Sequence, residues 1–191
     1  QDKFRTRYLG IIKEENKRLV GQVEKVLQAA ALDRKEFSLK LESIHLPAML
    51  QACMDQFALQ VENRGGKIEF IGEMKDPHIV GDVFHLTHLF NNLLDNAHKY
   101  STIATPITVL LTTQENQIQL MIKDEGVGIP MEERDKIFEK FYRIGDESTR
   151  TTKGTGLGLY LCKKISEFHH ASISVDANTP NGSIFKINFP I

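Results

Sequence analysis

The chain has 191 residues, of which 41% are hydrophobic, and its 24 lysines and arginines against 25 aspartates and glutamates give a formal net charge of −1. This balance excludes a general attraction for nucleic acid or for an anionic membrane, so any phosphate site must be built from local groups. The sequence has no apolar run near the roughly 20 residues that span a bilayer and no signal-peptide core, and Cys53 and Cys162 lack metal-ligand spacing. We therefore expect a soluble, cytoplasmic chain with two buried free thiols, and the start at Gln1 leads us to expect an excised fragment.

The first element in chain order is a helix expected over residues 5–32. Its apolar residues recur with heptad spacing, with first positions at Leu9, Val23 and Ala30 and fourth positions at Ile12, Leu19 and Val26. Two further apolar residues, Val20 and Leu27, widen the stripe, which favours a helical bundle, and one helix cannot bury such a stripe alone. We expect partner helices outside this chain or, as the alternative, packing of the helix on its own domain.

The hydrophobic pattern changes after residue 36, so we expect a helical segment over 1–36 and a main domain over 37–191. The expected elements of the main domain are a strand at 37–41, a helix at 46–63, a strand at 67–71, a helix at 83–100 capped by Asp82, strands at 107–113 and 118–123, a short helix near 131–141, a helix at about 156–169, and strands near 173 and at 184–189. These elements predict an α+β fold of two layers, a mixed sheet with helices on one face, preceded by one long helix.

The helix over 83–100 carries a polar stripe on an otherwise apolar sequence. Asn92 and Asn96 are four residues apart and Lys99 follows three residues later, so all three project from one face. Amide oxygens are hard ligands suited to Mg²⁺, which proteins usually hold together with substrate phosphates. We expect the two asparagines to bind the metal and Lys99 to contact a phosphate.

The segment from Asp124 to Pro130 reads Asp-Glu-Gly-Val-Gly-Ile-Pro and follows an expected strand. A carboxylate at the end of that strand accepts a hydrogen bond from the exocyclic amine of adenine and repels the carbonyl of guanine. Gly126 and Gly128 permit positive φ and place no side chain between the backbone and a base. Alone, the motif is equally compatible with an ordinary turn.

A second glycine-rich segment, Gly-Thr-Gly-Leu-Gly-Leu from Gly154 to Leu159, opens the next expected helix. Backbone N–H groups at a helix N-terminus bind phosphates, although the glycines also suit a hinge. Between the two glycine segments, residues 137–143 carry three aromatic side chains and Arg143. We expect a mobile lid anchored by Phe138 and Phe141, with Arg143 at the terminal phosphate. Taken alone, the aromatic side chains are more typical of a core.

The four segments in this order resemble the catalytic, ATP-binding domain of two-component sensor histidine kinases, within the superfamily of gyrase, Hsp90 and MutL-type ATPases. The resemblance covers roughly residues 37–191, with an asparagine box at 88–101, a first glycine box at 124–130, a phenylalanine box at 137–143 and a second glycine box at 154–159. It implies a Bergerat-type α/β sandwich that binds ATP and Mg²⁺ beneath a flexible lid. Residues 1–36 resemble the second helix of the family's dimerisation and phosphoacceptor hairpin.

By this resemblance the catalytic residues are Asn92, Lys99 and Arg143, and the metal ligands are Asn96 and Asn92. The complete set of residues expected to contact the nucleotide is Asn92, Asn96, Lys99, Tyr100, Asp124, Gly126, Gly128, Ile129, Phe138, Arg143, Gly154, Thr155, Gly156, Leu157, Gly158 and Leu159.

One departure from the family pattern limits what the chain does by itself. The family's phosphoacceptor lies in a sequence such as His-Glu-Leu-Arg-Thr-Pro, and none of the seven histidines has that context. We interpret all seven as ordinary surface or helix residues and expect no self-phosphorylation at the family site.

The resemblance implies two partners, a phosphoacceptor hairpin of the same or a second protomer and a response-regulator receiver domain. It also implies a homodimeric parent anchored in the bacterial inner membrane, and leaves the oligomeric state of the fragment open.

Two alternative functions remain beside the transfer of the γ-phosphoryl group of ATP to a histidine and then to a response-regulator aspartate. An ATPase of the same superfamily uses, by resemblance, a glutamate four residues before the magnesium asparagine; that place here is Asn92, which is not a base at neutral pH, so hydrolysis is disfavoured. The other alternative is a non-catalytic nucleotide-binding and dimerisation module, which the intact boxes disfavour. A related serine kinase is less favoured because the chain has the bundle helix and the phenylalanine box.

Overall fold

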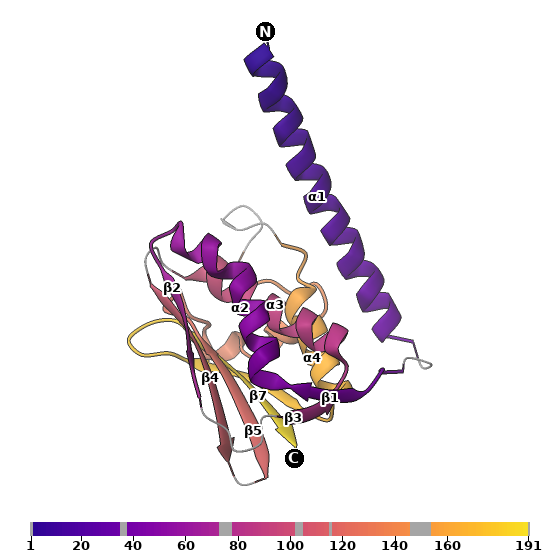
Figure 1. Cartoon of the computed structure of the whole chain (residues 1–191), viewed down its shortest axis with the longest axis vertical. Helices are drawn as coiled ribbons and strands as arrows, with labels where there is room; N and C mark the ends of the chain where they lie inside the picture. The colour runs from indigo at the N-terminus through magenta and orange to yellow at the C-terminus, as the bar shows by residue number, and fades with distance from the viewer. Residues whose placement is uncertain are drawn as a thin grey trace. The chain divides into compact units, whose positions relative to one another are not determined.

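A computed structural model describes residues 2–34, 38–72, 78–101, 105–114, 116–145 and 154–190 of the chain. The chain separates into two compact units, which we call the helical unit (Gln1–Phe37) and the sheet unit (Ser38–Ile191). Each unit is described by itself. Figure 1 shows the ribbon with its elements labelled.

The described part of the helical unit contains one long helix, α1 (Asp2–Leu32), which confirms the predicted helix and begins three residues earlier. At about 1.5 Å per residue it is about 46 Å long. Its heptad positions are largely exposed, since the exposed large apolar side chains include Leu9, Ile12, Leu19, Val23 and Val26. The predicted apolar stripe is therefore present along α1. Within the part of the chain that the structure describes, no helix is long and apolar enough to cross a membrane.

The sheet unit is built on a five-stranded mixed sheet with the order β2-β4-β5-β7-β6. Its strands are β2 (Lys67–Ile71), β4 (Pro106–Gln114), β5 (Gln117–Lys123), β6 (Ser172–Ala177) and β7 (Ser183–Pro190). The β2–β4 pair is parallel, and the other pairs are antiparallel. Buried and half-buried residues alternate along β5 and β7, as expected for a sheet with one face on the core.

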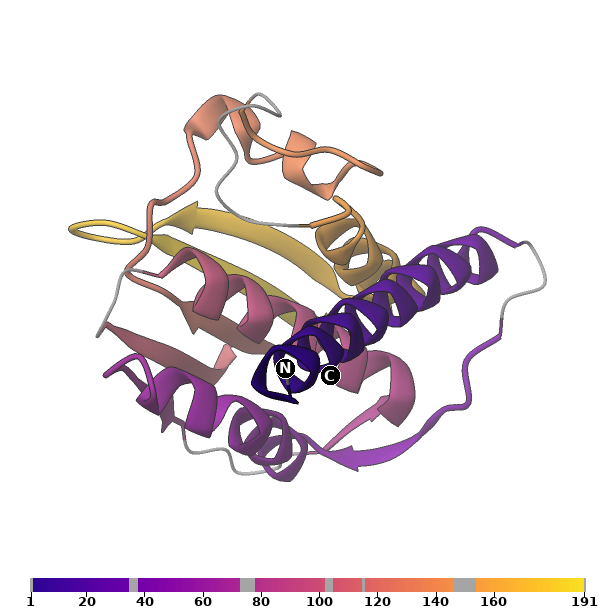
Figure 2. The ribbon, with the colours of Figure 1, turned by 90° about the horizontal axis from the view of Figure 1, so that it is seen from above.

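Three helices cover one face of this sheet: α2 (Leu46–Glu62), α3 (Val83–Tyr100) and α4 (Gly158–Phe168). Seen from above, α3 lies between α2 and α4 (Figure 2). Its apolar face is fully buried, including Leu86, Phe90 and Leu93, and each such side chain contributes roughly 1.5–3 kcal/mol of burial free energy. The predicted two-layer α+β fold is confirmed, and α3 is the central helix of the helical layer.

The start of α3 agrees with its prediction. Asp82 is the N-cap, and its side chain accepts a hydrogen bond from the His85 N–H at 3.1 Å. A cap of this kind satisfies one of the donors that a helix leaves free at its first turn. The Asp82 cap therefore fixes where α3 begins, and α3 in turn positions the asparagine box.

The strand predicted over 37–41 is wrong. Phe37 lies outside the described residues, Ser38–Leu41 forms no strand, and the strand begins one residue later as β1 (Glu42–His45). This strand pairs with β3 (His78–Gly81), an element that the sequence pattern missed, and the register places the two buried residues Ile44 and Ile79 opposite each other. The position of the strand is determined by its pairing with β3, and the alternation of apolar and polar residues over 37–41 does not reveal that partner.

Two boundaries also differ in the second half of the sheet unit. The short helix predicted near 131–141 is two separate turns of 3₁₀ helix, Met131–Glu133 and Lys136–Phe138. The helix predicted from residue 156 begins instead at Gly158, because Gly156 has a φ of +69° that no regular helix accommodates.

Candidate functional site

The centre of the candidate site is the carboxylate of Asp124, which is 3% exposed at the end of β5. Its Oδ1 accepts hydrogen bonds from the N–H of Gly126 at 2.9 Å and from the N–H of Ser183 at 3.3 Å. Burial raises the pKa of Asp124 above its ordinary value, although the two backbone hydrogen bonds act in the opposite direction. The result is a buried acid with one oxygen held by the backbone.

The loop between β6 and β7 holds the backbone of Asp124 from the other side. Asn178 Nδ2 donates to the Asp124 carbonyl at 2.9 Å, and the Asp124 N–H donates to the Ser183 carbonyl at 3.0 Å. Gly182 has a φ of +109°, and a Cβ there would overlap the Asp124 carbonyl oxygen. Sequence reasoning missed these three residues, because the sequence does not show that they would contact the end of β5.

The first glycine box lies against the C-terminal end of the asparagine helix. Ser101, which follows α3, forms a β-bridge with Gly126, and the Val127 N–H donates to the Tyr100 carbonyl at 3.3 Å. A Cβ at Gly126 would overlap that same carbonyl. Of the two glycines that permit positive φ, Gly128 has one, at +71°. Gly126 has no positive φ, and its missing side chain instead allows the close approach to Tyr100.

Gly128 faces the β6–β7 loop, since a Cβ there would lie 3.2 Å from the Gly182 carbonyl oxygen. The next residue, Ile129, is half-buried, and its carbonyl accepts a hydrogen bond from Arg134 Nε at 3.4 Å. The first glycine box is thus in contact with α3 at one end and with the β6–β7 loop at the other.

Along α3, the residues of the predicted polar stripe become more exposed toward the end of the helix. Asn92 is buried at 8% exposure, Asn96 is half-buried, and Lys99 is exposed and forms an ion pair with Asp95 one turn earlier. At Asn92, α3 meets α4, because a Cβ at Gly158 would lie 3.3 Å from Asn92 Oδ1. The structure therefore brings the predicted metal ligand Asn92 to the N-terminus of α4.

That N-terminus carries no side-chain cap. Its N-cap residue is Leu157, which is fully buried, and among the described residues no side chain caps this helix. Thr155 and Leu159 are half-buried on either side. Uncapped N–H groups at the start of a helix are suited to an anion.

The phenylalanine box joins the second glycine box through its backbone. The Phe141 N–H donates to the Gly156 carbonyl at 3.0 Å, and a Cβ at Gly156 would lie 2.6 Å from the Phe141 carbonyl carbon. Arg143 Nη1 donates to the Gly154 carbonyl at 3.0 Å. Phe138 is buried, as expected of an anchor, but Phe141 is 61% exposed, so its ring is no anchor. Part of the segment predicted to form the lid, residues 146–153, lies outside the described residues.

His169 contradicts the interpretation of all seven histidines as surface or helix residues. It lies just after α4, and its side chain is 7% exposed. Its Nδ1 is 2.7 Å from the Ile165 carbonyl oxygen, and its Nε2 accepts the Asp82 N–H at 2.9 Å. The two cysteines behave as predicted, being buried and free, and burial raises the pKa of Cys53 to about 11.

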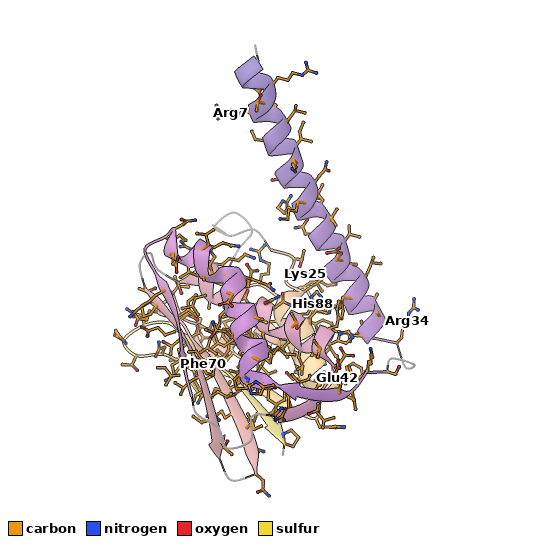
Figure 3. All side chains as sticks on the ribbon, viewed as in Figure 1. Arg7, Lys25, Arg34, Glu42, Phe70 and His88 are labelled. Atoms are coloured by element: carbon orange, nitrogen blue, oxygen red, sulfur yellow. The ribbon has the colours of Figure 1, made fainter. Side chains whose placement is uncertain are left out.

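These contacts connect all four boxes within the sheet unit. The asparagine box touches the first glycine box at Gly126 and the second at Gly158, and the second glycine box touches the phenylalanine box at Gly156. Figure 3 shows the side chains on this frame, with Phe70 on β2 and His88 on α3 labelled. The arrangement combines a buried carboxylate, amide oxygens and an uncapped helix N-terminus.

Comparison with known proteins gives concordant results. Residues 81–191 match the family described as histidine kinase-, DNA gyrase B-, and HSP90-like ATPase. The chain is 36% identical over 184 residues to the sensor protein RprX of Bacteroides fragilis, covering 95% of this chain and 36% of that protein. The chain thus spans about a third of the length of this curated relative.

Two solved structures share the fold. Full-length ShkA in complex with AMPPNP gives a TM-score of 0.83 at 22% identity, covering 96% of this chain and 38% of ShkA. Histidine kinase ThkA in complex with the response regulator TrrA gives a TM-score of 0.76 at 23% identity, covering 96% of this chain and 50% of ThkA. With the family match over more than half of its length, the chain belongs to the family of histidine kinase-, DNA gyrase B- and HSP90-like ATPases.

Proposed function

We propose that the sheet unit binds ATP with Mg²⁺ and is the catalytic part of a sensor histidine kinase. The observation that carries this proposal is the position of Asn92, a buried amide whose oxygen lies next to Gly158 at the uncapped N-terminus of α4. A metal ligand beside an anion site is what a magnesium–phosphate complex requires. The family membership and the sensor-protein name of the relative RprX support the proposal.

Adenine recognition is assigned to Asp124. Both described hydrogen bonds of its carboxylate end on Oδ1, so we assign Oδ2 to the exocyclic amine of adenine. Guanine presents a carbonyl at that position, which a carboxylate repels. Tyr100, Ile129 and the two glycines of the first box lie at this end of the site.

The chemistry of the available donors fits Mg²⁺. Asn92 and Asn96 contribute hard amide oxygens from successive turns of α3. Among the described residues no three His, Cys, Asp or Glu side chains are grouped to hold a metal, so the site is expected to depend on the asparagines, the phosphates and water. Bound Mg²⁺ would supply neutralisation of phosphate charge.

Two basic residues are assigned to the phosphates. Lys99 is paired with Asp95, and Arg143 is bonded to the Gly154 carbonyl within the second glycine box. Both side chains must share or exchange these partners when a nucleotide binds. Thr155, Leu157 and Leu159 flank the glycines whose N–H groups would receive the phosphates, and buried Phe138 holds the phenylalanine box beside them.

The proposed reaction is phosphoryl transfer to an imidazole. The bond between the γ-phosphorus and the oxygen of ADP breaks, a bond forms between that phosphorus and an imidazole nitrogen, ADP leaves, and the N–H proton of the ring is released to solvent. The chain's contribution would be positioning and charge neutralisation. The phosphoryl group then passes to a response-regulator aspartate, a partner class that the ThkA–TrrA complex illustrates for ThkA.

We further propose that the helical unit is the second helix of a dimerisation hairpin. An exposed apolar stripe that includes Leu9, Ile12, Leu19 and Val23 requires partner helices in water. The parent is proposed to be a homodimer that is anchored in the bacterial inner membrane with this part in the cytoplasm, in line with relatives that are named sensor proteins.

The decisive experiment incubates the full-length parent with γ-labelled ATP and Mg²⁺ and tests the stability of the label on the protein. Acid-labile and base-stable label is expected, because phosphohistidine has that stability. Labelled phosphate released without labelling of the protein would overturn the kinase proposal in favour of an ATPase. Absence of any nucleotide binding by calorimetry would instead favour a degenerate module.

A further inference from the structure

We propose that His169 is a positioning residue of the nucleotide site, which holds the C-terminal end of α4 against the start of α3. The inference rests on the proposed function, because it concerns the site in which ATP would bind. His169 belongs to none of the four boxes, and Asp82, its partner, lies 87 residues away in sequence. The pair therefore joins two distant parts of the chain.

The first step concerns the state of the ring. His169 Nδ1 lies 2.7 Å from the Ile165 carbonyl oxygen, and a carbonyl only accepts hydrogen bonds, so Nδ1 carries the proton. Nε2 is then the bare nitrogen, and it accepts the Asp82 N–H at 2.9 Å. A neutral ring in this tautomer therefore donates to a carbonyl at the end of α4 through Nδ1 and accepts the N–H of the residue that precedes α3 through Nε2.

The second step concerns the space for the ring. Gly81 precedes Asp82, and a Cβ at Gly81 would lie 3.1 Å from His169 Cδ2 and 2.6 Å from Leu86 Cδ1. The ring is 7% exposed, and burial lowers the pKa of His169 below its ordinary value, which agrees with a neutral imidazole. The absence of a side chain at Gly81 thus lets the imidazole reach the backbone of Asp82.

The third step follows the contact between the two helices. Asp82 meets His169 at one end, Cys162 Sγ lies 3.7 Å from the Leu89 carbonyl oxygen in the middle, and Asn92 meets Gly158 at the other end. Residue numbers rise along α3 as they fall along α4, so the two helices run antiparallel. His169 fixes the distance between α3 and α4 at one end of their contact. At the other end, the same distance determines how far the Asn92 oxygen lies from the N-terminus of α4, where the metal and the phosphates would bind.

The fourth step connects the spacing to function. A packed interior transmits a displacement instead of absorbing it, and α4 is only 11 residues long. Releasing its C-terminal end would alter the distance between the Asn92 oxygen and the N–H groups at the start of α4. Because a metal and a phosphate must be held together there, nucleotide affinity depends on that distance.

The test uses two substitutions that divide the two bonds of the ring. His169→Gln places an amide oxygen near the position of Nε2 and so keeps an acceptor for the Asp82 N–H. His169→Asn places its amide near the position of Nδ1, so it can keep the hydrogen bond to the Ile165 carbonyl but loses the one from Asp82. The matched control is His45→Ala, which removes another imidazole that accepts a backbone N–H, from Ala48 at 3.1 Å, at the start of α2. All variants are made in the 191-residue chain and checked for folding by circular dichroism.

The readout is the calorimetric dissociation constant for AMPPNP with Mg²⁺, measured below the melting temperature of every variant. We expect His169→Asn to weaken binding about fivefold or more, His169→Gln to stay within about twofold, and His45→Ala to lower the melting temperature without changing affinity. Wild-type affinity in folded His169→Asn would overturn the inference, since a merely structural residue affects stability alone.

A second variant keeps the inference falsifiable should His169→Asn not fold. Gly81→Ala crowds the ring, and its AMPPNP affinity is expected to fall while that of His45→Ala does not; unchanged affinity would overturn the inference. If the wild-type chain itself fails to bind AMPPNP, the proposed function and this inference fall together. If the wild type binds and both His169 variants bind equally well, only the inference is overturned.

Discussion

Around Asp124 the proposed site is held by backbone groups, whereas around Asn96, Lys99 and Arg143 it is made of side chains on a helix surface and a loop. The Asp124 carboxylate is 3% exposed and bonded to two backbone N–H groups. Lys99 is exposed and paired with Asp95, and Arg143 contacts a backbone carbonyl. The proposed adenine end is thus set by the fold before a nucleotide arrives, and the proposed phosphate end would exchange contacts when it does.

The difference follows from what each end recognises. A base is recognised by the direction of single hydrogen bonds, which requires a rigid acceptor. Phosphates carry diffuse charge that flexible cations neutralise from several positions. Changes at the adenine end should therefore act in an all-or-none way, and changes at the phosphate end should be graded.

The largest effect is expected for Asp124→Asn. The amide oxygen still accepts the Gly126 and Ser183 N–H groups, but an NH₂ group replaces the second acceptor and meets the adenine amine as donor against donor. We expect ATP affinity to fall by about a hundredfold or more, equivalent to about 3 kcal/mol. Calorimetry measures it, with Asp176→Asn as the control, since Asp176 is an acid half-exposed at the surface. Equal affinities in the two variants would contradict the assignment of adenine to Asp124.

A large effect on folding is expected for Gly182→Ala. At a φ of +109° and with its Cβ overlapping the Asp124 carbonyl oxygen, alanine should lower the free energy of unfolding by about 2 kcal/mol or more. Gly154→Ala is the control, because a Cβ there meets nothing within 4 Å, and its cost should stay near 0.5 kcal/mol, roughly the level of a surface substitution. Chemical denaturation compares them, and similar costs would show that the adenine end is not rigid.

A graded effect is expected for Asn96→Ala at the phosphate end. Asn96 is half-buried on the same stripe as Asn92, and loss of one amide ligand should weaken ATP binding by about tenfold in the presence of Mg²⁺. Without Mg²⁺ the substitution should have little effect. Calorimetry with and without the metal decides the matter, and an equal loss under both conditions would remove Asn96 from the metal site.

How far the sequence predicts this structure depends on whether the relevant contacts are local. The helix α3 was predicted from Val83 to Tyr100 with its Asp82 cap, and β2 from Lys67 to Ile71, as the structure has them. Caps and apolar periodicity act within a few residues, so the sequence displays them directly. The asparagine and glycine boxes were found in the same way.

The missed features all depend on partners distant in sequence. Strand β3 has four residues and exists only because β1 pairs with it. Asn178 and Gly182 contact Asp124 because β7 pairs with β5, and His169 is buried because it reaches Asp82. None of these pairings leaves a pattern within a short window. The contacts that hold Asp124 from β7 and its preceding loop were therefore less predictable than Asp124 itself and the side chains of the proposed phosphate end, which all lie within motifs.

A smaller effect is expected from pH. Burial lowers the pKa of His169 in the folded chain, against the raising effects of its Ile165 hydrogen bond and of Asp82; nearby His170 lowers it further. The unfolded chain then binds the proton first as the pH falls below about 6.5. The free energy of unfolding should decrease over that window, by at most about 1.4 kcal/mol per pH unit for this ring. Denaturation of wild type and His169→Gln between pH 7.5 and 5.5 measures the difference, and parallel slopes would exclude His169 as the source.

The smallest effect, and the most direct test of exchangeable contacts, is expected for Asp95→Ala. The pair of Asp95 with Lys99 joins partly exposed residues one turn apart on α3, so its loss should cost stability only about 0.3–0.5 kcal/mol. Lys99 would then no longer have to leave a carboxylate to reach a phosphate, so affinity for ATP should rise slightly while affinity for adenosine stays the same. The Lys164→Ala change, which breaks an ion pair of the same kind on α4, is the matched control and should change neither. A fall in ATP affinity in Asp95→Ala would mean that Asp95 holds Lys99 in its working position, and the phosphate end would then be as pre-arranged as the adenine end.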